Sequence, residues 1–342
     1  MDKVGTHAAA IAKAKAILGR LLSDYHYKEL LKLETNQEVI DYLKNQTHYH
    51  AVLEFAEGES LDQIEVRIEK YFFSTYEKFY HYYVDNYRDF FKALLFRYEV
   101  ENLKLYLRLL ARNDKIEDLE THLIFSSLYT NLDYSELSKA STITEFIEGL
   151  KDTLYYKPLK QFIEDDSSLM VFHMEMVLDK LYFDRLYQAI TKLGSYDRKI
   201  MLELLGINID ILNIQWLYRG RRFFDISSEE LFNFTLLHGR RYDDKVVRML
   251  CYLPLDEFRA FISSGDYKDI FSDKEYMMER AMERHLFYAL NDYTKKATFS
   301  IAIPVVLLFK FEYEIRDLFT ILEGIHYRSE DVKDLLIREI ER

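Results

Sequence analysis

The chain has 342 residues, with 46 Lys or Arg against 58 Asp or Glu, and a net charge of −12. This length corresponds to two or three domains of ~100–150 residues. An acidic surface repels a phosphate backbone, so we expect no general nucleic-acid binding. The single cysteine, Cys251, excludes an intrachain disulfide and a zinc site built on several cysteines.

Residues 6–16 are rich in alanine but include Lys13 and Lys15, so they do not have the apolar core of a secretory signal. The longest uncharged run, residues 297–309, has thirteen residues. A membrane-spanning helix requires ~20. We therefore expect a cytoplasmic chain without direct membrane insertion, which reaches a membrane only through a partner.

Most of the sequence predicts amphipathic helix, because apolar residues recur every three or four positions, as they do along residues 61–79. With only 10 Gly and 3 Pro, the chain has few of the turn residues that hairpins need. Acidic residues after Ser227 or Ser228 and after Ser329 predict helix starts there. Pro304 either begins a helix in its first turn or kinks a longer one, and we favour a start. We predict an all-α fold with almost no sheet.

Three segments share one pattern, in which an acid is followed by two spacers, an aliphatic residue, an acid, a base, a spacer, a bulky apolar residue and Phe. They are residues 65–73, 175–183 and 279–287, which are separated by 110 and 104 residues. We call this pattern block one. Generic helices share a hydrophobic phase but not a register of charges, so block one indicates an internal repeat.

Two further blocks keep the same order in every repeat. Block two comprises residues 99–108, 210–219 and 314–323, and block three comprises residues 38–43, 145–150 and 257–262. The six offsets average 108 residues. We predict three similar helical domains, at residues 1–115, 116–226 and 227–342. Without flexible linkers at the joins, the three domains are expected to pack as one stiff body.

The acid pairs Asp165-Asp166 and Asp243-Asp244 are similar to the aspartate-rich magnesium motif of all-α terpenoid cyclases. The third carboxylate is missing, and a hard cation needs several converging oxygen ligands. Helix capping or surface exposure is the better interpretation. An enzyme of this magnesium-dependent kind is kept as the third hypothesis for function.

Other candidate sites are equally incomplete. Glu323 and His326 have the Glu-x-x-His spacing of di-iron bundles in one copy, whereas such sites use two. His48 and His50 are interpreted as ordinary polar histidines. No phosphate-binding loop, nucleophile elbow or His-Glu-x-x-His motif occurs. We predict no catalytic residue, no metal site and no cofactor.

Basic residues gather in one region of the acidic chain. The arginines with partner-binding potential are Arg219, Arg221, Arg222, Arg240 and Arg241, accompanied by His238 and Arg248. Arginine pairs with both oxygens of a carboxylate, so the cluster predicts a docking patch for an acidic partner surface. A solvated helix face is the alternative.

The blocks resemble the C subunit of archaeal and bacterial V/A-type ATP synthases, whose eukaryotic counterpart is the d subunit of vacuolar ATPases. The segments that carry the resemblance are residues 20–23, Leu43 with 47–49, 98–104, 314–318 and 330–332. The similarity spans the whole chain. Residues 6–14 depart from the pattern, because they lack the aromatic and arginine start of that family.

The resemblance implies a funnel-shaped body of three similar helical domains around a pseudo-threefold axis. It also implies a non-catalytic adaptor at the cytoplasmic face of the membrane, which caps the rotating proteolipid ring and seats the central shaft. Such an adaptor transmits torque between ATP chemistry and transport of H⁺ or Na⁺. The alternative is a helical-repeat interaction scaffold unrelated to a rotary ATPase.

Overall fold

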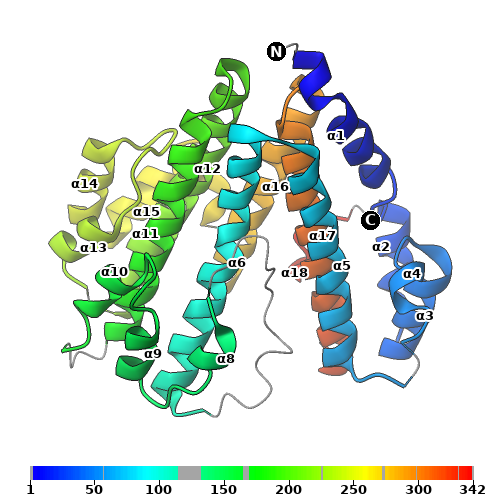
Figure 1. Ribbon diagram of the computed structural model, residues 1–342, viewed down its shortest axis with the longest axis horizontal. Coiled ribbons are helices and arrows are strands. Elements are labelled where there is room, and N and C mark those ends of the chain that lie inside the picture. The colour runs from blue at the N-terminus through cyan, green and yellow to red at the C-terminus, as the bar shows by residue number, and fades with distance from the viewer. Residues whose placement is uncertain are drawn as a thin grey trace. The chain divides into compact units, whose positions relative to one another are not determined.

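The computed structural model describes residues 3–56, 58–114, 132–164, 169–224, 226–271, 274–297, 299–329 and 331–340 (Figure 1). Every regular element in these ranges is a helix, as predicted from the sequence. The longest helices are α1 (Lys3–Leu18), α5 (Leu61–Tyr82), α6 (Asp85–Arg112), α11 (Met170–Thr191), α12 (Ser195–Phe223), α16 (Met278–Lys296) and α17 (Ala302–His326).

Short helices connect the long ones. They are α2 (Asp24–Leu30), α3 (Asn36–Gln46), α4 (His50–Leu53), α8 (Tyr134–Leu137), α9 (Ile143–Gly149), α10 (Tyr156–Lys160), α13 (Ser228–Phe234), α14 (Asp244–Tyr252), α15 (Leu255–Ser263) and α18 (Val332–Leu335), together with the 3₁₀ turns η1 (Lys268–Ile270) and η2 (Glu275–Met277).

The contacts divide the chain into two compact units. Unit 1 comprises residues 1–83, 195–211 and 256–342, and unit 2 comprises residues 84–194 and 212–255. In unit 1, α17 packs against α1, α5 and α16, and in unit 2, α6 packs against α11. The three domains at residues 1–115, 116–226 and 227–342 stay a prediction.

Two of the three predicted helix starts are confirmed. Ser227 is the N-cap of α13 and accepts a hydrogen bond from the Glu230 N–H, and Pro304 lies in the first turn of α17. The helix predicted after Ser329 is present as α18, which begins at Val332, but its N-cap is Asp331 and not Ser329. The Ser329 N–H donates to the Gly324 carbonyl at 2.8 Å, and Arg328 before it has φ +55°, as in the motif that closes a helix C-terminus.

The repeated blocks correspond to equivalent helix positions. Block one lies on α5, α11 and α16, and block two lies on the helix that follows each of them, α6, α12 and α17. The acids that begin block three, Glu38, Glu145 and Glu257, each occupy the third position of a short helix, α3, α9 or α15. An acid at this position favours a helix start, because it lies near unpaired N–H groups at the positive end of the helix.

The first acid of block two is buried in all three copies. Glu99, Asp210 and Glu314 are 4%, 0% and 4% exposed. Each accepts a hydrogen bond from a buried tyrosine hydroxyl, Tyr155 to Glu99, Tyr267 to Asp210 at 2.7 Å and Tyr49 to Glu314 at 2.9 Å. We call these the Tyr–carboxylate contacts. Burial next to a carboxylate raises the pKa of Tyr49 and of Tyr155 well above the usual value.

The three tyrosines share a local setting. Each is the residue before a short helix, α4, α10 or η1. In two copies a threonine fixes the turn: Thr47 and Thr153 donate to backbone carbonyls at 2.6 and 2.7 Å and accept from the N–H of Tyr49 and Tyr155 at 3.2 Å. The threonine therefore orients the backbone from which the tyrosine reaches the buried acid.

The residue three positions after each buried acid is also polar, and it forms hydrogen bonds with a segment that follows later in the chain. The Asn102 amide donates to the Tyr134 hydroxyl at 3.2 Å. Asn213 forms two hydrogen bonds with the backbone of Leu236, at 2.9 and 2.8 Å. Asp317 accepts from the N–H groups of Ile337 and Arg338 at 2.6 and 3.1 Å. The polar positions of block two thus bind segments that are distant in sequence.

The ion pairs between the helices of block one and block two are not the same in every repeat. In unit 2, Lys104 and Arg108 of α6 pair with Asp179 and Glu175 of α11 at 2.9 and 2.6 Å. In the register of the blocks, α17 of unit 1 has Phe319 and Glu323 at the places of these two cations. The corresponding acids on α5, Glu65 and Glu69, therefore have no such cation opposite them.

The missing cations change the acid–base behaviour of α5. Burial, with the negative charges of Glu323 and Asp62, raises the pKa of Glu65 to about 6. Burial, with the charge of Glu65, raises the pKa of Glu69 to about 7. A carboxyl group whose pKa is raised by folding binds protons more tightly in the folded state. Its contribution therefore lowers stability as the pH rises from about 4.5 to about 7.

We expect Tyr155→Phe and Tyr267→Phe each to lower the free energy of unfolding by about 1–3 kcal/mol, because each removes a hydrogen-bond donor from a buried carboxylate. Tyr25→Phe is the control, since Tyr25 is 66% exposed and its replacement should change stability by less than about 0.5 kcal/mol. The measurement is the thermal midpoint of each variant. Equal midpoints for the buried and exposed variants would contradict a stabilising role for the contacts.

We expect Glu323→Arg to stabilise the chain at pH 8 by about 0.5 kcal/mol, because it replaces a repulsion with a pair of the kind that Arg108 forms with Glu175. The gain should shrink at pH 5, where Glu65 is protonated. Arg108→Glu is the opposite change in unit 2 and should destabilise. Thermal midpoints at both pH values test this, and a gain for Glu323→Arg that is independent of pH counts against it.

Candidate functional site

The predicted arginines all belong to unit 2, where the C-terminal end of α12 carries three of them. Arg219 and Arg222 are exposed. Arg221 is half-buried and donates to the carbonyls of Leu217 and Leu253. Burial lowers its pKa. Arg221 therefore joins α12 to the end of α14, while its two neighbours face outward.

Arg240 and Arg241 are also exposed and lie just before the start of α14. Because α14 has nine residues, its ends are separated by ~13 Å. Arg221 contacts the residue that follows α14, so the structure places the two groups of arginines at opposite ends of this helix. They form two smaller basic areas within unit 2.

Exposed apolar side chains accompany both groups, a feature that the sequence analysis missed. They are Phe223 at 59%, Phe224 at 40%, Leu237 at 41%, Met249 at 41% and Tyr252 at 51% exposure. Aromatic side chains with arginine are the residues enriched at protein interfaces. The signal in the sequence was the Phe223-Phe224 pair directly after Arg221-Arg222, but its exposure depends on where α12 ends.

The other members of the basic region make ring contacts. His238, with φ +72°, stacks on Tyr187 at 3.8 Å between ring centroids. The Arg248 guanidinium lies 3.9 Å from the centre of the Phe232 ring. Both side chains therefore contact rings of unit 2, although both are exposed. Arg219, Arg222, Arg240 and Arg241 are exposed too, and we call these four the outward-facing arginines.

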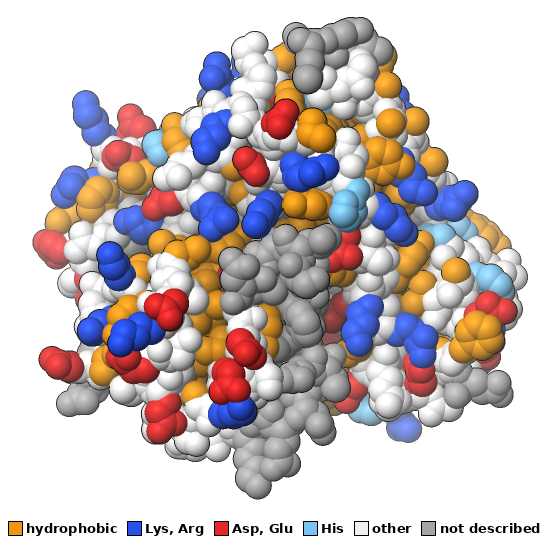
Figure 2. Space-filling model, viewed as in Figure 1, with side chains coloured by type: hydrophobic (Ala, Val, Ile, Leu, Met, Phe, Trp, Pro, Cys, Tyr) orange, Lys and Arg blue, Asp and Glu red, His pale blue; other side chains and the backbone are white. Residues whose placement is uncertain are grey.

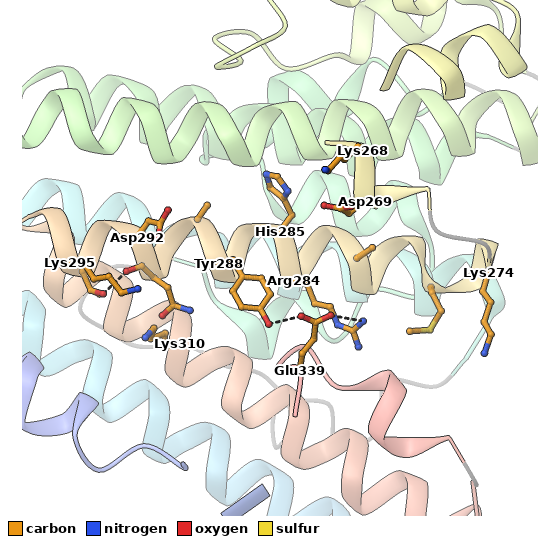
Figure 3. A pocket seen from close by; sticks show the side chains of 15 residues that line it. Lys268, Asp269, Lys274, Arg284, His285, Tyr288, Asp292, Lys295, Lys310 and Glu339 are labelled. Atoms are coloured by element: carbon orange, nitrogen blue, oxygen red, sulfur yellow. Dashed lines mark hydrogen bonds and ion pairs between the residues drawn. The ribbon is translucent and has the colours of Figure 1, made fainter. Parts of the chain in front are cut away.

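Unit 1 contains a groove of about 1260 Å³, which we call the α16 groove (Figure 3). Residues of η1, η2, α16, α17 and the C-terminal segment line it. Its charged lining residues are Lys268, Lys274, Arg284, Lys295 and Lys310, with Asp269, Asp292 and Glu339. Five cations against three carboxylates make the groove more basic than the chain as a whole.

The C-terminal segment places a carboxylate in this groove. Glu339 accepts a hydrogen bond from the Tyr288 hydroxyl at 2.8 Å and lies 3.9 Å from the Arg284 guanidinium (Figure 3). Burial together with this carboxylate raises the pKa of Tyr288 to about 12. Arg284 also donates to the carbonyls of Asp334 and Leu336 at 2.6 and 3.0 Å. The middle of the groove therefore binds one carboxylate and two backbone carbonyls of the chain's own C-terminal segment.

Lys295 and Lys310 gather at another part of the groove, beside Asp292 (Figure 3). The Lys310 ammonium lies 5.8 Å from the centre of the Phe287 ring. Burial, with the nearby charges of Arg338 and Lys295, lowers the pKa of Lys310. In the part of the chain that the structure describes, neither Lys295 nor Lys310 has an ion pair.

The candidate metal ligands have other partners. Asp243 is the N-cap of α14 and accepts from the N–H groups of Lys245 and Val246. His48 contacts Glu314 at 2.8 Å. Asp165 and Asp166 lie outside the described residues. Over the described ranges, no group of three or more His, Cys, Asp or Glu side chains is arranged to hold a metal ion.

Hydropathy singles out α12. It is the one helix of the described residues whose length and composition would suit a membrane span, and 67% of its apolar window is buried within the protein. This burial is typical of a core helix.

On the face drawn in Figure 2, basic and acidic side chains are interspersed with hydrophobic ones, so the net charge of −12 does not make that face uniformly acidic.

Comparison with known proteins identifies the family. The model of the family described as "ATP synthase (C/AC39) subunit" matches residues 10–334. The C subunit of the A-type ATP synthase of Methanosarcina acetivorans is 27% identical over 98% of this chain and 93% of its own length. The protein of the same name from Methanosarcina mazei is 28% identical over 78% of this chain and 72% of its own length.

A more distant archaeon supplies a similar match. The C subunit of the A-type ATP synthase of Thermococcus kodakarensis is 23% identical over 90% of this chain and 83% of its own length. These matches confirm the resemblance that the repeated blocks indicated. The match of the family model to residues 10–334 covers nearly all of the sequence, and the chain therefore belongs to the ATP synthase (C/AC39) subunit family.

Proposed function

We propose that this protein is a non-catalytic adaptor in the central stalk of a rotary ATP synthase or ATPase. It links the rotor shaft to the proteolipid ring and transmits torque between ATP chemistry and transport of H⁺ or Na⁺. Membership of the family carries the proposal, because the relatives that match nearly the whole chain are named as C subunits of A-type ATP synthases.

The recurrence of the Tyr–carboxylate contact supports a threefold-repeated body. The same donor and acceptor types, at equivalent helix positions, occur with Glu99, Asp210 and Glu314. In each case the tyrosine and its acid lie on opposite sides of a predicted domain boundary or at opposite ends of the chain. A body whose repeats are joined in this way by buried polar contacts resists deformation, which is what torque transmission requires.

The adaptor acts at the cytoplasmic face of the membrane, peripherally and without inserting into the bilayer. It uses one surface for the ring and another for the shaft. The outward-facing arginines of unit 2, with exposed Phe223 and Tyr252 nearby, are suited to an acidic protein partner. We assign this surface to partner binding in the complex.

Co-purification tests the proposal. The affinity-tagged chain, expressed in its own cell and extracted from the membrane in mild detergent, should carry both the proteolipid ring and the shaft subunits. Membranes stripped of the chain should lose coupling between ATP hydrolysis and ion transport. The alternative, a helical-repeat scaffold unrelated to a rotary ATPase, is supported instead if tagged chain retains neither ring nor shaft.

We expect Arg222→Glu with Arg241→Glu to weaken binding of the shaft subunits at least tenfold at low salt, because like charges then face the acidic partner. Arg221 is left unchanged, since its hydrogen bond to Leu253 holds α14 in place. Binding is measured by biolayer interferometry over a series of salt concentrations. The difference should diminish as salt screens the charges.

Lys151→Glu with Lys157→Glu is the matched control. Both residues are exposed in unit 2, and the change in net charge is the same. This variant should bind the shaft within about twofold of the unmodified chain. Equal affinities for both double variants would remove the arginines from the proposed interface while leaving the rotary role itself untouched.

A further inference from the structure

The α16 groove of unit 1 combines volume, positive charge and a bound carboxylate. We propose that the α16 groove is a docking site for an acidic, extended segment of a partner protein, whose carboxylates pair with Lys295 and Lys310. All the residues that line the groove belong to unit 1, and the isolated chain suffices for the test. The proposal therefore does not require the proposed rotary role.

The chain's own C-terminal segment shows what the groove binds. Leu336, with φ −71° and ψ 146°, is extended, and residues 336–340 are not helical. Glu339 in this segment reaches Tyr288 and Arg284, while Arg284 also donates to backbone carbonyls. A carboxylate on a non-helical segment is thus already a ligand of the groove, and a partner segment would use the same chemistry.

Lys295 and Lys310, which do not contact Glu339, are the cations available to bind further carboxylates. Lys295 and Lys310 have no ion pair within the described ranges, and Figure 3 shows both beside Asp292, away from Lys274. Lys310 is half-buried against Phe287 and faces the charges of Arg338 and Lys295. A carboxylate placed between these lysines would relieve their mutual repulsion in a partly desolvated site.

The dimensions of the groove favour a polypeptide over a small anion. Its volume of about 1260 Å³ exceeds the ~300–1,000 Å³ of typical small-molecule sites. Arg284 and Lys295 are eleven residues apart on α16, which is ~16 Å along the helix. An extended segment of ~5 residues spans that distance, whereas a phosphate group contacts one end of it at a time.

The probe for the test is a fluorescein-labelled peptide of twelve residues in which glutamate alternates with serine. Its binding to the full chain is followed by fluorescence anisotropy at low salt. The matched peptide with glutamine in place of glutamate should not bind. Lys295→Gln with Lys310→Met should weaken binding of the acidic peptide at least fivefold, and methionine preserves the contact with Phe287.

Lys28→Gln with Lys78→Gln is the control for net charge, because both lysines are exposed in unit 1 outside the groove. It should change the affinity by less than twofold. Glu339→Gln removes the internal carboxylate and should tighten peptide binding by about twofold. This variant keeps the test valid if the double lysine variant fails to fold.

Three results would overturn the proposal. The first is an equal loss of affinity in the groove variant and in the control variant, which would indicate general attraction to positive charge. The second is equal binding of the glutamine peptide. The third is displacement of the acidic peptide by micromolar tripolyphosphate through the same two lysines, which would make the groove a site for small polyanions.

Discussion

The fold depends on buried carboxylates that receive hydrogen bonds from tyrosine. A carboxylate inside a protein is costly unless donors surround it, and Glu314 has three: the Leu22 N–H at 2.5 Å, the His48 imidazole at 2.8 Å and the Tyr49 hydroxyl. These donors come from the first sixty residues, whereas Glu314 belongs to the last long helix. Apolar packing alone would allow one helix to slide along another. The hydrogen bonds to a buried carboxylate form at only one relative position of the helices. The contact therefore fixes register as well as adding stability.

The sequence predicts the buried acids of the Tyr–carboxylate contacts but not the tyrosines that donate to them. The repeated register of block two marks Glu99, Asp210 and Glu314 as equivalent, and helical periodicity predicts their helices. The tyrosines were not found, because the chain has 28 of them. Tyr49, Tyr155 and Tyr267 are separated by 106 and 112 residues, close to the offsets of block three. However, only the fold shows that a residue before a short helix reaches a helix far away in sequence.

The arginine region shows a different limit. Five arginines within residues 219–241 are close in sequence, and their spacing predicts one patch. The intervening chain enters α13, turns back and begins α14, so the arginines lie at the two ends of a nine-residue helix. Closeness in sequence therefore does not predict that these side chains lie on the same surface. The α16 groove was missed for the reverse reason, since its charged residues are spread over residues 268–339, on several elements, and form no motif.

The contacts between the two ends of the chain set an order for folding during synthesis. Residues 84–194 contain α6, α11 and their ion pairs, so this part can assemble while the ribosome is still translating. The first helices must wait, because the partners of Tyr49 and of the Leu22 backbone, Glu314 and Arg338, emerge last. Until then the apolar faces of α2 and α3 are unprotected. Chaperone occupancy on nascent chains should accordingly persist on the N-terminal segment until translation ends.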